Sequence, residues 1–176
     1  MTSSRETMEH LFSCFDTAYL VLGESAATLT NDAYVIRTYE MARALGEVAL
    51  SFREYLDQVT SPALAPLEEV LRRAVASDDS GAMVLFAMAT VVGPRVLVSL
   101  RDARALGGFD ESALQVLDLA SRVLVREIRA VGDVASRFPL IEDPAWQASA
   151  RTLSTTLDGP ETLKVSVFPA KLRTSV

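Results

Sequence analysis

The stretch AMVLFAMATVVGPRVLVSL, residues 82–100, decides the fold of this 176-residue chain. Its first half is apolar on every side of a helix, and such a helix is stable only where other elements surround it. A membrane span needs about 18 or more uninterrupted apolar residues, whereas Pro94 and Arg95 stand in the middle of this run. The stretch therefore predicts a buried core helix. We expect it to kink or restart near Gly93, because Pro94 cannot donate a backbone hydrogen bond and its ring clashes with the preceding turn.

The chain on either side of this run has apolar residues at steps of three and four, the period of an amphipathic helix. Five more helices are expected, over residues 4–27, 32–59, 63–76, 110–138 and 144–157. Hydrophobic residues make up 49% of the sequence, which is enough for one sizeable core at this length. We therefore predict an all-α fold. A single domain over residues 1–161 is expected to form an antiparallel bundle of five to six helices, with the apolar helix at its centre.

Polar residues mark where several of these helices begin. Asp110 is suited to an N-cap, and Thr30, Asn31 or Asp32 offers a cap for the second helix. Residues 78–79 are Asp-Asp, like the start of an acidic Mg²⁺ motif, but a hard-cation site also needs a carboxylate on a facing helix. Capping of the apolar helix explains this pair instead.

The C-terminal segment, residues 162–176, differs from the rest of the chain. Residues 163–168 alternate and include β-branched side chains, a pattern typical of a short strand. A lone strand in a helical chain has no partner for its backbone groups. The segment either docks on the bundle through Val165, Val167 and Phe168, or it pairs with a second copy of the chain or with another protein.

Charge and cysteine content limit the class of protein. The net charge is −6 and the isoelectric point is about 4.8, which disfavours a general grip on nucleic acid. Residues 1–79 hold 13 acidic and 6 basic side chains, whereas the remaining residues hold 10 and 11. Cys14 is the sole cysteine, so no disulfide forms within the chain, and the N-terminus lacks the features of a signal peptide. We expect a cytoplasmic protein with no membrane span.

Three arginines stand out on the helix over residues 110–138. Its expected apolar seam includes Leu114, Leu117, Ser121, Leu124, Ile128 and Val131. Arg122, Arg126 and Arg129 form a row on the outer side, which could take a phosphate or an acidic partner. Asp118 and Asp133 flank the row in helical register, an arrangement that favours ordinary surface ion pairs.

Few residues are suited to catalysis or metal binding. His10 and Cys14 lie four residues apart and share a helix face, so they could act as two metal ligands or as a base and a thiol. We favour a structural role over both. In that interpretation Cys14 is a small buried hydrophobic residue and His10 lies at the edge of the apolar stripe. One histidine cannot assemble a ferritin-like di-iron centre or a His-rich zinc site. Glu40, Glu47 and Glu54 repeat on a solvated face, so we expect no catalytic, cofactor or metal site.

A possible apolar pocket involves two helices. Met83, Phe86 and Met88 lie in the apolar helix, and Trp146 lies in the last helix. Together they either line a cavity for an apolar small molecule or pack as ordinary core, and close packing is the more common arrangement.

The leading functional hypothesis is a non-catalytic protein–protein interaction or assembly protein, which we expect to be a homodimer. The wide apolar stripe over 32–59, the seam over 110–138 and the strand-like tail together motivate it. The alternative is a small-molecule-binding regulatory domain with an apolar cavity, like a helical sensor domain. An enzyme comes third, because one histidine and solvated carboxylates leave few groups for acid–base catalysis.

Overall fold

The computed structural model describes residues 4–57, 59, 64–135 and 144–157, and the regular elements among them are all helices. They are α1 (Ser4–Ala26), α2 (Asp32–Leu56), α3 (Ala65–Ser77), α4 (Ala82–Ala87), the π-helical segment η1 (Met88–Val92), α5 (Gly93–Leu106), α6 (Glu111–Ala135) and α7 (Pro144–Leu157). Because α4, η1 and α5 follow one another without a break, these ranges make six helical rods. The predicted all-α bundle is confirmed. The expected tail at 162–176 lies outside the described residues.

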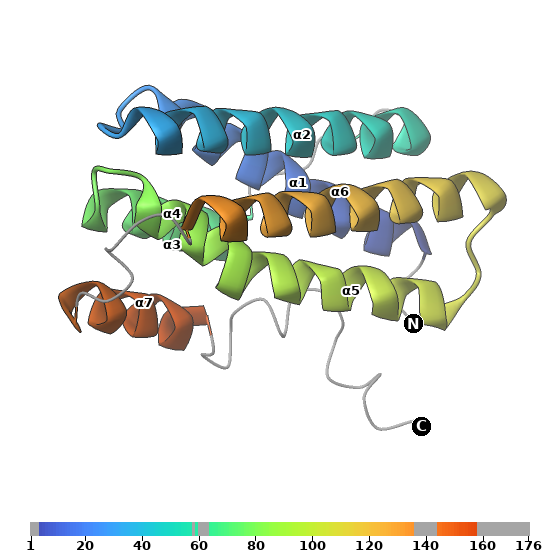
Figure 1. Ribbon diagram of the computed structural model, residues 1–176. Coiled ribbons are helices and arrows are strands. Elements are labelled where there is room, and N and C mark those ends of the chain that lie inside the picture. Colours follow the sequence, from blue (N-terminus) through green and yellow to red (C-terminus); the bar gives the residue numbers. More distant parts are fainter. Residues whose placement is uncertain (1–3, 58, 60–63, 136–143, 158–176) are drawn as a thin grey trace.

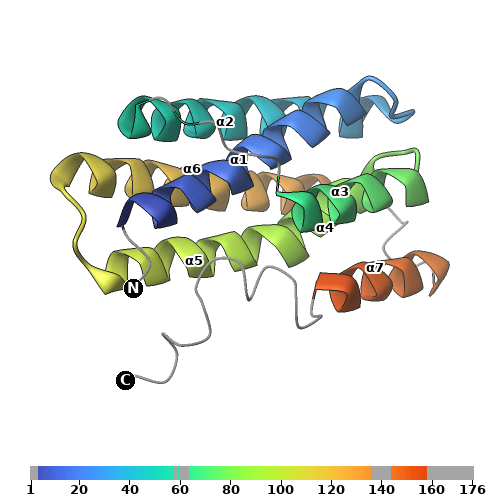
Figure 2. The same ribbon diagram turned by 180° about the vertical axis from the view of Figure 1, so that it is seen from behind.

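The helices pack in two layers that share the long apolar rod. In Figure 1, α2, α6 and α5 lie side by side across the view, and α1 passes behind α6. Figure 2, seen from behind, brings α1 and α3 to the front and leaves α6 at the back. α1 and α2 form the most extensive helix pair, and α7 packs against α3 and α4.

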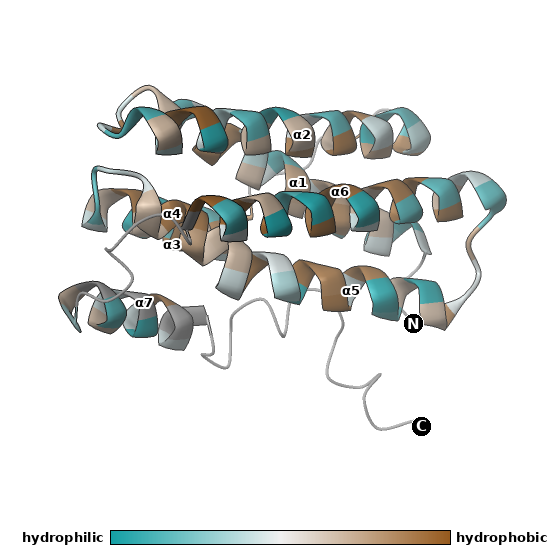
Figure 3. Ribbon diagram, viewed as in Figure 1, coloured by the Kyte–Doolittle hydropathy of each residue, from teal (hydrophilic) through white to brown (hydrophobic). Residues whose placement is uncertain are grey.

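The rod from α4 to α5 contacts α1, α2, α3, α6 and α7, which are all the other helices in the described ranges. Met83, Val84 and Leu85 are at most 1% exposed. Figure 3 shows hydrophobic colours concentrated at α4 and the turns that follow it, with hydrophilic colours on the outward turns of α2 and α6. The surrounding helices therefore keep water away from a helix that has no polar side.

The same rod is the one described helix that is long and apolar enough to cross a membrane, judged by length and composition. Its most apolar window is 61% buried inside the bundle. A core helix has the same composition as a membrane span, and the packing of Ala82–Leu106 against its neighbours is sufficient to explain it.

A π turn stands where the proline was expected to disturb the helix. The Gly93 backbone N–H donates to the Met88 carbonyl five residues earlier, and the Gly93 backbone remains helical at φ −57° and ψ −47°. The chain thus continues through Pro94, and the irregularity takes the form of one wide turn, as is common beside prolines and functional sites. The kink of the helix axis stays a prediction.

The position of Gly93 leaves no room for a side chain. A Cβ atom at this position would lie 2.6 Å from the Met88 carbonyl oxygen and 2.7 Å from Ile128 Cδ1. The missing side chain therefore lets α6 approach the π turn closely.

Side-chain caps explain where three helices start. Asn31 Oδ1 accepts hydrogen bonds from the N–H groups of Ala33 and Tyr34, at 3.1 and 3.2 Å. Asp110 Oδ1 accepts from Ala113 N–H at 2.8 Å. Asp78 Oδ2 accepts from Met83 N–H at 3.0 Å, so the capping role expected for Asp78 is confirmed.

The seam of α6 lies partly on a different side from the one we expected. Leu114 is 37% exposed, whereas Ala113 and Ala120 are fully buried together with Leu117. The buried positions are Ala113, Leu117, Ala120, Leu124, Glu127 and Val131. The buried side of α6 therefore contains two alanines and one glutamate besides its larger apolar residues.

Replacing Gly93 with alanine is expected to destabilise the fold by about 1–3 kcal/mol, because the new methyl group meets a backbone carbonyl that cannot move aside cheaply. Gly23→Ala in α1 is the matched control, since a Cβ there meets no atom within 4 Å. That control should stabilise the protein by about 0.5–1 kcal/mol through helix propensity. Urea unfolding of both variants measures this difference, and equal effects would contradict the close packing at Gly93.

Candidate functional site

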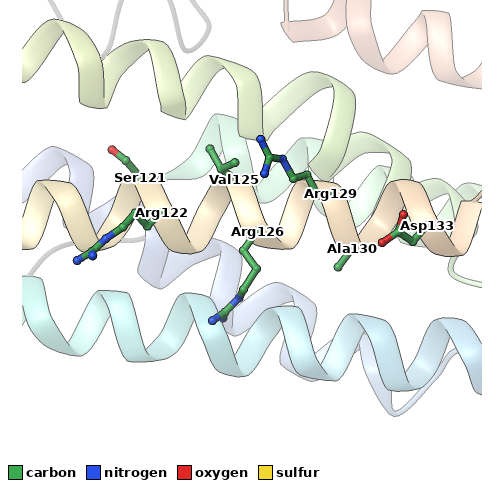
Figure 4. Close-up of a pocket in the computed structure, with 7 residues that line it drawn as sticks. All are labelled: Ser121, Arg122, Val125, Arg126, Arg129, Ala130 and Asp133. Atoms are coloured by element: carbon green, nitrogen blue, oxygen red, sulfur yellow. The ribbon is translucent and has the colours of Figure 1, made fainter.

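The structure brings the three predicted arginines to one hollow on the outward side of α6. This α6 hollow has a volume of about 590 Å³. Its described lining consists of Ser121, Arg122, Val125, Arg126, Arg129, Ala130 and Asp133. In Figure 4, Arg122 and Arg126 lean toward α2, whereas Arg129 leans toward α5. The guanidinium groups therefore lie on the α2 side and on the α5 side of Val125, which lines the bottom of the hollow.

Asp118 forms a surface ion pair, as expected, but its partner is Arg104 of α5 and not an arginine of the row. Arg122 and Arg129 have no ion pair with any residue in the described part of the chain. Two cationic side chains of the row therefore remain available to an anion, with Asp133 at one end of the hollow.

Arg126 is bound to a buried carboxylate. Its Nε and Nη2 atoms both lie 2.9 Å from Glu127 Oε1, and the Glu127 side chain is only 5% exposed. The other carboxylate oxygen, Oε2, accepts a hydrogen bond from Arg37 Nη2 of α2. Arg37 also pairs with Glu40, with 3.0 Å between Nη1 and Oε2. Glu127 thus joins α6 to α2.

The Arg37–Glu127 pair was missed from the sequence. Glu127 occupies a seam position between buried Leu124 and Val131, where an apolar residue is expected. A buried carboxylate needs a cationic partner. A glutamate at a seam position was therefore the sign in the sequence that a buried ion pair is present. The partner itself is 90 residues away and could not be inferred from helix periodicity.

The residues of the predicted apolar pocket belong mainly to the core. Met83 and Met88 are 1% and 2% exposed, and Phe86 is half-buried. Met88 helps to line an internal void of about 10 Å³, which is near the minimum space for one water molecule. That void is too small for an organic ligand. The side chain of Trp146 lies outside the described residues, as do Val165, Val167 and Phe168 of the tail.

His10 and Cys14 are close, but burial opposes their use in catalysis. The Cys14 sulfur lies 3.8 Å from His10 Nε2. Burial raises the pKa of the Cys14 thiol to about 12, and burial also lowers the pKa of His10. Both shifts disfavour the thiolate–imidazolium pair that a cysteine nucleophile requires. Among the described residues, no group of three or more His, Cys, Asp or Glu side chains could hold a metal ion.

A second unusual surface lies on α2. Ile36, Tyr39 and Leu50 are 59%, 61% and 55% exposed. Together with Arg43 they form the outer row of α2, which faces away from the core. The sequence did not single out this row, because it runs beside the glutamates that were expected on the solvated face of the helix.

No protein-family model, curated protein or solved structure matches this chain. The α6 hollow and the outer row of α2 are therefore the two candidate functional surfaces of the described chain.

The buried pair should show strong energetic coupling. Arg37→Met and Glu127→Leu are each expected to lower the free energy of unfolding by about 2–4 kcal/mol, because each leaves a buried charge with fewer partners. The double variant should lose less than the sum of the single losses, with a coupling of about 1–3 kcal/mol.

The exposed pair Arg72–Glu24, with side chains 51% and 61% exposed, is the control for this cycle. Its coupling should stay below about 1 kcal/mol. Chemical denaturation provides all the values, and additive effects at Arg37 and Glu127 would refute the buried interaction.

Cys14 should be chemically inert in the native protein. At pH 8 its thiol stays protonated, because its pKa of about 12 lies far above the ordinary value of 9.0. Alkylation by iodoacetamide, followed by mass spectrometry, should be slower than in the unfolded chain by on the order of a hundredfold or more. The same shift means that stability falls as pH rises from 9.0 toward 12. Equal alkylation rates in native and unfolded protein would show that the thiol is accessible and ionised.

Proposed function

We propose that this protein is a non-catalytic assembly protein that forms a homodimer through the outer row of α2. The observation that supports the proposal is the exposure of three large apolar side chains, Ile36, Tyr39 and Leu50, on one helix face. Clustered apolar surface of this kind is typical of an interaction site, whereas scattered exposed residues need no explanation.

The spacing of the row suits a second copy of the same helix. Ile36 and Leu50 each lie seven residues from Arg43, on opposite sides of it. In an antiparallel pair of α2 helices with the two-fold axis at Arg43, Ile36 of one copy faces Leu50 of the other. A two-fold interface needs a self-complementary surface of this kind.

The charges of α2 are complementary in the same arrangement. Arg43 Nε lies 3.9 Å from Glu47 Oε1, and both side chains are about 70% exposed. Around the proposed axis, Arg43 of each copy also comes within reach of Glu47 of the other. The two arginines would otherwise repel each other, so these glutamates make the pairing favourable and help to select the antiparallel orientation.

A close contact between α1 and α2 extends the apolar face. The ring of Tyr19 lies against Gly46, with ring atoms 2.8–3.2 Å from the position that a Cβ would occupy. Tyr19 is 40% exposed. Gly46 therefore lets an aromatic ring lie flat beside the outer row, which broadens the surface that a partner helix can cover.

The proposal predicts a dimer whose mass is twice the 19.1 kDa of one chain, measured by light scattering coupled to size exclusion at micromolar concentration. Ile36→Asp should weaken association at least about tenfold, a loss of roughly 1.4 kcal/mol or more, because a symmetric interface contains the substituted residue twice. Circular dichroism checks that the variant retains its helices.

Val98→Asp on α5 is the matched control, since Val98 is also an exposed apolar residue, at 45%. The control should remain dimeric. A monomeric wild-type protein, or a dimer that Ile36→Asp does not weaken, would refute the proposal.

A further inference from the structure

We propose that the α6 hollow is a binding site for a small organic phosphate, held by Arg122 and Arg129. This inference is independent of the α2 interface, because its residues lie on another helix and bind through charge. It assigns a ligand class to a site that the assembly function does not use.

Positive charge is concentrated in the α6 hollow. The chain has a net charge of −6, yet three arginines lie within eight residues of α6 and line one hollow. Asp118, one of the two flanking carboxylates expected to pair with the row, pairs with Arg104 instead. Cations gathered in this way repel one another, and a bound anion relieves the repulsion while it accepts hydrogen bonds from the guanidinium groups.

The three arginines differ in their partners. Arg126 directs two nitrogen atoms at Glu127, so its charge is already shared with a buried carboxylate. Arg122 and Arg129 have no such partner among the described residues. They are seven residues apart, about 10 Å along a helix, and their side chains lean to different sides of α6 (Figure 4). An anion with several oxygen atoms, such as a diphosphate, accepts hydrogen bonds from both when these two exposed side chains turn toward each other across Val125.

The hollow is broad and open to solvent, and its described lining lies on one face of α6. Its volume of about 590 Å³ exceeds what one phosphate group fills, so an organic group can lie beside the phosphate. Val125 and Ala130 supply apolar surface for an organic part of the ligand. The phosphate end therefore lies near Arg122 and Arg129, and the organic part lies over Val125 and Ala130.

Isothermal titration calorimetry with ADP, inorganic pyrophosphate and citrate tests the proposal on the full chain. ADP should bind more tightly than pyrophosphate, because its organic part contacts Val125 and Ala130. Binding of both should weaken as salt is raised. Citrate, a carboxylate anion of similar charge, should bind at least about tenfold more weakly than ADP.

The double variant Arg122→Gln/Arg129→Gln should lose at least tenfold in ADP affinity. Arg126 is left unchanged, because removing it would disturb buried Glu127. Arg53→Gln/Arg101→Gln is the matched control, since it removes two exposed arginines elsewhere and changes the net charge equally. The control should bind ADP as the wild type does.

Three results would overturn the assignment. The first is the absence of ADP and pyrophosphate binding by the wild-type protein. The second is an equal loss of ADP affinity in the control variant, which would indicate a general charge effect. The third is citrate binding as tight as that of ADP, which would identify a carboxylate site and point to an acidic protein partner.

Discussion

Enclosure of the apolar helix Ala82–Leu106 is the requirement around which the other helices are arranged. This helix has no polar side, so any part of it left in contact with water destabilises the fold. The cost is roughly 25 cal/mol for each Å² of apolar surface that stays exposed. In the described part of the chain, five helices contact the rod. Gly93 lets Ile128 of α6 approach it closely. The helix pair α1–α2 completes the cover, with Phe15 and Phe52 stacked at 5.7 Å between ring centroids.

Most of the fold could be predicted from local patterns, because helix starts and stops depend on nearby residues. Asn31, Asp78 and Asp110 cap the helices that follow them, and these signals are present in the sequence itself. The π turn at Met88–Val92 was not foreseen. Pro94 indicates that the helix must adjust, but the form of the adjustment depends on how closely Ile128 of α6 approaches Gly93. Contacts of that kind link distant parts of the chain and leave no periodic signal.

The candidate sites were predicted less completely, for related reasons. Spacing along one helix correctly grouped Arg122, Arg126 and Arg129. It could not show that Asp118 would turn to Arg104 on another helix, or that Glu127 would meet Arg37. Exposure of the α2 row also escaped prediction, because periodicity indicates which face of a helix is most apolar but does not count the neighbours available to cover the rest.

Glu127 connects the helices that carry the two surfaces. Its two oxygen atoms bind different helices, Arg126 of α6 on one and Arg37 of α2 on the other. Arg126 also lines the α6 hollow, and Arg37 is the neighbour in sequence of Ile36 in the outer row. The strength of each hydrogen bond depends on how much of the shared charge the other guanidinium neutralises. Arg126 and Arg37 therefore share one buried negative charge, and replacement of either arginine would leave the other as the remaining described cation on Glu127.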